Sequence, residues 1–302
     1  MTRVATIPMH RTLFDAIQRS QQKLADAQVQ LATGKKAQTY ADLGTEVVRT
    51  LSARTLVARQ EAYGTVAKRL GTTLSIQDAN ISGIESATES LRGQMLEAIG
   101  TGQSAGLQEA IETAFQQFRS ALNADEGGVP LFAGSQTDQL PFKPQTLADA
   151  AGLPTADAFA NDGVRASARV ADGLNVQFGV GASDLGSKIF DSFRTLAEAG
   201  TIGDVPTPAQ MAALSTAVQQ MANGLVDVRS INADNGRKQA QVETLATRAD
   251  DRSVLLQDVI SKNEDADLVQ LASDLTQRRT ALEASYSVFS QLSGLSLVNY
   301  LR

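Results

Sequence analysis

Apolar residues spaced alternately three and four positions apart mark both ends of the chain. Near the start this spacing joins Leu13, Ile17, Ser20, Leu24, Ala27 and Leu31, and Gly34 follows. Near the other end it joins Leu268, Leu271, Leu275, Arg278, Leu282, Ser285, Phe289 and Leu292. An average period of 3.5 predicts helices with one narrow apolar stripe, as in coiled coils. Because such a stripe cannot be buried by its own helix, each terminal helix needs a partner.

The neighbouring segments predict longer helices. From residue 46 to 100 an apolar stripe runs through Tyr63, Val66, Leu70, Leu74, Ile81, Ile84, Leu91 and Met95. Residues 237–292 contain neither Gly nor Pro, which predicts a second long helix. At 1.5 Å per residue each would be roughly 80 Å long. A shorter amphipathic helix is expected over residues 107–122.

The middle of the chain has a different pattern. Six of the seven prolines lie between Pro130 and Pro208. Two runs of alternating apolar and polar residues, 164–170 and 174–180, flank Asp172-Gly173 and predict a β-hairpin. A short strand over 129–132 and a helix over 188–199 complete this segment.

The predicted fold is mainly α: an antiparallel rod of long helices formed by both chain ends, with a small α/β insert that contains the hairpin. Residues 1–36 and 265–302 form a terminal coiled-coil region, and residues 37–125 with 207–264 form the helical rod. Residues 126–206 form an outer α/β insert domain. Because the prolines gather in this insert, we expect the rod to fold without it.

Composition excludes most catalytic chemistry. The chain has no Cys, one His and a formal net charge of −6, so thiol nucleophiles, multi-histidine metal sites and a nucleic-acid-binding role are disfavoured. Gly181–Lys188 resembles a phosphate-binding loop, but Ser187 precedes Lys188 in the wrong order, which favours a simple turn. Two acidic groups, Asp250-Asp251 and Glu264 with Asp265 and Asp267, favour a solvated helix face. We assign no catalytic, cofactor-binding or metal-binding residue.

Four stretches resemble the flagellin superfamily and, within it, the proteins of the junction between hook and filament. They are the helix end and turn at Leu24–Lys36, the sequence Leu131–Asp138 followed by Pro141-Phe142, the segment Leu268–Ala284, and the ending Leu292–Leu301. The resemblance implies a non-enzymatic structural subunit of the bacterial flagellum that joins hook to filament through helical self-assembly of its terminal helices.

The same resemblance implies where the protein acts and what it contacts. Its partners would be other copies of itself, the neighbouring hook-junction protein, flagellin and an export chaperone, without nucleic acid or stable membrane insertion. The location would be extracellular, in the flagellum, reached by type III export without a cleaved signal peptide. The alternatives are a flagellin of the filament itself and, from a different class, a cytoplasmic coiled-coil adaptor or a weak nucleotide-binding enzyme.

Two interpretations of the terminal stripes stay open. They pack only against each other in an intramolecular coiled coil, or they also pack against neighbouring copies. For the second, the expected interface residues are Leu13, Ile17, Leu24, Leu31, Leu271, Leu275, Leu282, Phe289 and Leu292. A narrow stripe offsets little of the ordering cost of about 1–2 kcal/mol per residue. We therefore expect the ends to be largely disordered in the free subunit and helical in the assembly.

Overall fold

The computed structural model describes the backbone of residues 3–298 and the side chains of residues 11–291. The chain divides into two compact units. The terminal unit comprises the described parts of residues 1–59 and 252–302, and the central unit comprises residues 60–251. Two of the helices, α2 (Val47–Thr101) and α6 (Pro208–Glu264), contribute residues to both units.

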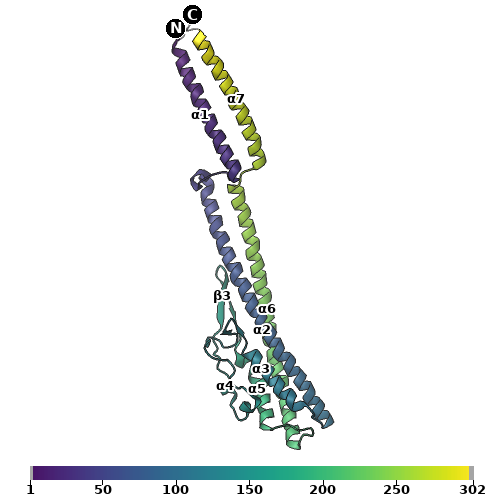
Figure 1. Ribbon diagram of the computed structural model, residues 1–302. Coiled ribbons are helices and arrows are strands. Elements are labelled where there is room, and N and C mark those ends of the chain that lie inside the picture. Colours follow the sequence, from purple (N-terminus) through teal and green to yellow (C-terminus); the bar gives the residue numbers. More distant parts are fainter. Residues whose placement is uncertain (1–2, 299–302) are drawn as a thin grey trace. The chain divides into compact units, whose positions relative to one another are not determined.

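The terminal unit is built around two helices from opposite ends of the chain. Helix α1 (Arg3–Thr33) and helix α7 (Leu268–Val298) pack side by side and antiparallel (Figure 1). Gly34 follows α1 with φ of 68°, a left-handed conformation that glycine adopts without the cost of a Cβ. The short 3-10 helix η1 (Tyr40–Glu46) then leads into α2.

The single helix predicted over residues 237–292 was wrong in two respects. The helix begins earlier, at Pro208, and it ends at Glu264, after which α7 starts at Leu268. The break occurs because Ala266 donates its amide to the Gly34 carbonyl, at 2.8 Å, instead of continuing the helical ladder. The Asp267 carboxylate then accepts from the amides of Val269 and Gln270, at 3.0 and 3.1 Å, and caps the new helix.

In the central unit, α2 buries a strict heptad stripe. Its buried members alternate at spacings of three and four: Ala67, Leu70, Leu74, Gln77, Ile81, Ile84, Thr88, Leu91, Met95 and Ala98. The sequence placed Val66 in this stripe, whereas the structure exposes Val66 and buries Ala67. The glycines within α2 do not interrupt it. Of the buried polar members, Gln77 donates its Nε2 to the Leu131 carbonyl at 3.3 Å, whereas its Oε1 has no hydrogen-bond partner among the described residues.

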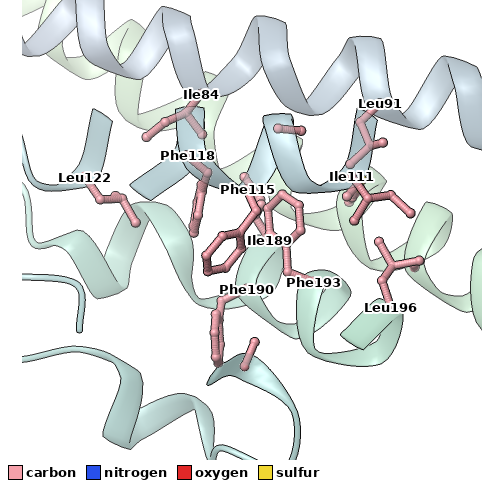
Figure 2. Close-up of a cluster of buried hydrophobic side chains, with 14 of the residues drawn as sticks. Ile84, Leu91, Ile111, Phe115, Phe118, Leu122, Ile189, Phe190, Phe193 and Leu196 are labelled. Carbon is pink, nitrogen blue, oxygen red and sulfur yellow. The ribbon is translucent and has the colours of Figure 1, made fainter. Parts of the chain in front are cut away.

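The central unit also contains a core rich in phenylalanine. Seven of the ten phenylalanines lie in it: Phe115, Phe118, Phe132, Phe142, Phe159, Phe190 and Phe193. They come from α3 (Leu107–Leu122), α5 (Ala182–Glu198) and the segment between them, and they pack with Ile84 and Leu91 of α2 (Figure 2). Phe142 lies 5.4 Å from Phe118 and 6.0 Å from Phe115, measured between ring centroids.

This core crosses the boundary expected at residue 126. Phe142, inside the predicted insert, contacts phenylalanines of α3, outside it. These contacts count against the expectation that the helices fold without residues 126–206, which stays a prediction. The domain boundaries themselves stay a prediction.

Two small hairpins lie in this region, the first beginning one residue before the predicted insert. Strands β3 (Ala166–Ala171) and β4 (Leu174–Phe178) pair antiparallel around Asp172-Gly173, as the alternating pattern predicts. Strands β1 (Asp125–Glu126) and β2 (Val129–Pro130) form a second pair, shorter than the predicted strand over 129–132. The remaining short elements are η2 (Leu147–Ala150) and α4 (Thr155–Ala158). The mainly α fold with a small strand-containing insert is confirmed.

Candidate assembly surface of the terminal helices

The apolar stripes of α1 and α7 face each other within the chain. Ile17 is 5% exposed and Leu282 is 9% exposed, and both are buried where the two helices pack. Half-buried residues flank them along the same stripe: Leu13, Leu24, Leu271, Leu275 and Phe289. Leu31 is exposed, and Leu292 lies outside the residues whose side chains are described. The structure thus brings most of the predicted residues together in an intramolecular pair.

A second set of apolar side chains on the same two helices is exposed. Its members are Phe14, Val29 and Leu31 on α1, and Leu268, Val269, Tyr286 and Val288 on α7. Val269 is 83% exposed. Sequence reasoning missed all of these except Leu31 and Leu268 because they stand beside the heptad stripe and not in it. Apolar residues next to a heptad stripe could have indicated this second set, because a helix pair buries only one face of each helix.

A cluster of charged groups joins the terminal pair to the beginning of α2 and the end of α6. We call it the junction clasp, and it consists of Lys35, Arg54, Glu264 and Asp265. Arg54 holds Glu264 through three contacts, with Nη2 at 2.6 and 2.8 Å and Nε at 3.0 Å from its carboxylate oxygens. Lys35 Nζ lies 3.6 Å from Glu264 and 2.6 Å from Asp265.

Main-chain hydrogen bonds reinforce the clasp. The Lys36 amide donates to the Glu264 carbonyl at 2.7 Å, and Ala266 donates to Gly34. Asn263 Nδ2 donates to the Thr50 hydroxyl at 3.1 Å, which adds a contact between α6 and α2. The segment that follows α1 is therefore hydrogen-bonded directly to the end of α6 and to the segment that leads into α7.

The clasp shifts the titration of its members in the direction that favours charge. The hydrogen bond from Arg54 holds the pKa of the Glu264 carboxyl below its usual value despite the burial of that group. Lys35 lowers the pKa of Asp265 by the same kind of contact, and the pKa of Lys35 is raised in return. The predicted solvated acidic face was wrong at Glu264, whose side chain is only 8% exposed.

The other candidate sites have ordinary structural roles. Gly181 precedes α5, its amide lies 3.4 Å from the Asp184 carboxylate, and Lys188 pairs with Asp227 at 2.6 Å. The simple turn predicted at Gly181–Lys188 was wrong: Gly181 is the N-cap, and residues 182–188 form the first turns of α5, with the lysine paired to Asp227. Asp250 pairs with Lys68 at 2.8 Å. Within the described residues, acidic and histidine side chains form no group that could hold a metal ion. None of the described helices combines the length and apolarity needed to cross a bilayer.

Comparison with solved structures places this architecture among known proteins. A Vibrio parahaemolyticus protein assigned as flagellar hook-associated is similar with a TM-score of 0.62 and 17% identity, over 74% of this chain and 100% of that one. FlgL of Bacillus cereus is similar with a TM-score of 0.59 and 15% identity, over 69% of this chain and 98% of that one. The chain has a flagellin-like fold. Sequence comparison agrees, since residues 4–137 match the model of the bacterial flagellin N-terminal helical region.

The flagellin-like chain also has a full-length relative. Flagellar hook-associated protein 3 of Escherichia coli (strain K12) is 23% identical over an alignment of 326 positions that covers 98% of each protein. The resemblance inferred from four short stretches is confirmed. The first of them, Leu24–Lys36, lies inside the matched N-terminal region, where it forms the end of α1 and the first part of the clasp.

Proposed function

We propose that this chain is a structural subunit of the bacterial flagellum that joins the hook to the filament by helical self-assembly of its terminal helices. The observation that carries the proposal is the match to a flagellar hook-associated protein over 98% of both chains. The terminal pair supports it physically, because α1 and α7 bury one stripe internally and leave a second apolar set outside. A helix pair that faced only water would gain nothing from seven exposed apolar side chains, whereas contact with neighbouring copies would bury them.

The partners follow from this role. The chain would contact other copies of itself, the adjoining hook-junction protein and flagellin, and an export chaperone would hold it before assembly. The subunit would act as a non-enzyme outside the cell, after export without a cleaved signal peptide. N-terminal sequencing of the secreted protein tests the last point, since a start displaced by 20 to 30 residues from Met1 would mean a cleaved signal.

A filament flagellin is the less favoured alternative. The full-length relative and the Vibrio structure are hook-associated proteins and not flagellins. The nucleotide-binding enzyme is disfavoured because Gly181–Lys188 forms the N-cap and first turns of α5 and its lysine is paired with Asp227. The cytoplasmic adaptor is disfavoured by the match to a flagellar hook-associated protein.

Deleting the gene tests the proposal. Electron microscopy of the deletion strain should show hooks without attached filaments and free flagellin in the medium, and a plasmid copy should restore attachment. Normal filaments on the deletion strain would contradict a junction role. Hooks that carry short or unstable filaments would instead indicate a flagellin.

A further inference from the structure

The junction clasp differs from the other ion pairs of the terminal unit in its burial. Glu264 is 8% exposed, whereas the carboxylates of the pairs Lys262–Asp258 and Arg279–Glu283 are more than half exposed. A carboxylate removed from water needs partners, and loss of one partner leaves an uncompensated charge. Exposed pairs contribute little because water and salt screen them. We therefore expect loss of the clasp to cost more stability than loss of either of these exposed pairs.

Glu264 also contacts more segments than an ordinary ion pair does. Its side chain accepts from Arg54 of α2 and lies near Lys35, which follows α1. Its main-chain carbonyl accepts from the amide of Lys36. One residue at the end of α6 therefore binds the beginning of α2 and the connection that leaves α1.

The orientation of the terminal pair depends on the two connections that join it to α2 and α6 and on the contacts that hold these connections. The two connections to it are residues 34–46, which include Gly34 and Gly44 at positive φ, and residues 265–267. Glycines in such connections allow many directions unless other contacts fix one. Arg54 is additionally stacked on Tyr40 of η1, 5.9 Å from the ring centroid, which ties the longer connection to the same guanidinium.

We propose that Glu264 is a positioning residue for assembly: held by Arg54 and Lys35, it fixes the direction in which the α1–α7 pair leaves α2 and α6. The proposal rests on the function proposed above, because a subunit whose terminal helices build a helical assembly must present them at a repeated angle. An error in that angle recurs in every subunit. Loss of the clasp should therefore impair assembly while leaving the helices and the aromatic core intact.

The matched variants are Glu264→Gln and Asp258→Asn. Both remove one carboxylate charge from the last turns of α6, but only the first removes it from a buried site. In the deletion strain, Glu264→Gln should lower the fraction of hooks with filaments by about tenfold or more, equivalent to about 1.4 kcal/mol. Asp258→Asn should behave as the wild type. Equal amounts of each variant in the culture medium of a strain without junction assembly would show that export is unaffected.

Hydrogen exchange on the purified protein separates positioning from a purely structural role. The amides of Lys36 and Ala266 should exchange faster in Glu264→Gln, because they report on the clasp directly. Amides of α3 and α5 should be unchanged. Arg54→Lys keeps the charge but loses the forked contact, so it should give an intermediate loss of assembly.

Each outcome is decisive. Normal filament attachment with Glu264→Gln would overturn the proposal, as would faster exchange throughout the central unit, which would mean general destabilisation. A wild-type plasmid that fails to restore filaments would instead count against the proposed function.

Discussion

Replacement of Phe142 tests whether the middle segment and the helices around it share one core. Phe142 is fully buried, and its ring contacts four others, Phe115, Phe118, Phe159 and Phe190, at centroid distances from 5.4 to 6.0 Å. Phe142→Ala should therefore destabilise the central unit by about 3–5 kcal/mol.

The upper part of this range is expected because the site cannot collapse easily. Asn123, at the end of α3, holds the main chain of Phe142 from both sides: its Oδ1 accepts from the Phe142 amide and its Nδ2 donates to the Phe142 carbonyl, each at 2.9 Å. A clamped backbone preserves the cavity that the missing ring leaves. For a unit of this size the loss corresponds to a fall in melting temperature of about 6–20 °C.

Differential scanning calorimetry of the purified protein measures this fall. Phe14→Ala is the matched control, since Phe14 is an exposed phenylalanine of the terminal unit. It should leave the transition of the central unit unchanged. The reasoning is refuted if Phe142→Ala shifts this transition by less than about 3 °C, or if a separate transition for residues 126–206 melts early while the helices keep their wild-type value.

Two further predictions concern the terminal unit. Leu282→Ala removes a buried side chain at a cost of about 2–5 kcal/mol, so it should reduce the fraction of hooks that carry filaments; a wild-type fraction would mean that the α1–α7 stripe is not packed. The clasp should also weaken in acid: the folded state lowers the pKa of Glu264, so its contribution is present above its ordinary value of about 4.5 and is lost as the pH falls through the lower folded value. Exchange of the Lys36 and Ala266 amides, corrected for intrinsic rates, should accelerate over that interval in the wild type and show no such acid step in Glu264→Gln.

Local patterns predicted the elements whose ends are set locally. Helix α3 begins and ends at residues 107 and 122 as expected, since Gly102 and Gly106 precede it and its apolar period is clear. The hairpin was predicted from Asp172-Gly173 because the turn residues define the register of the flanking strands. The start of α5 was placed six residues too late because Gly186 was taken as loop, whereas it packs inside the helix against Phe118.

Features that depend on distant residues were not predictable in this way. The break at residues 265–267 contains no Gly or Pro and arises from a hydrogen bond to Gly34. Glu264 was expected to be solvated because its partner, Arg54, lies 210 positions away in the sequence. Ala67 was overlooked in favour of Val66 because a small side chain carries a weak hydrophobic signal, although small residues let paired helices approach closely. The aromatic core was hidden by the low overall aromatic content.

The most direct test of the account compares the terminal helices in the free and assembled protein. The central claim is that α1 and α7 are assembly surfaces, and we expect the order of the α1–α7 pair to depend on neighbouring copies. Limited proteolysis with hydrogen exchange should show residues 11–33 and 268–291 to be readily cleaved and rapidly exchanging in the purified subunit. The same residues should be protected in hook–filament junctions isolated from cells, while α3 and α5 are protected in both. Full protection of both termini in the free subunit, or continued cleavage in the assembled junction, would contradict the claim.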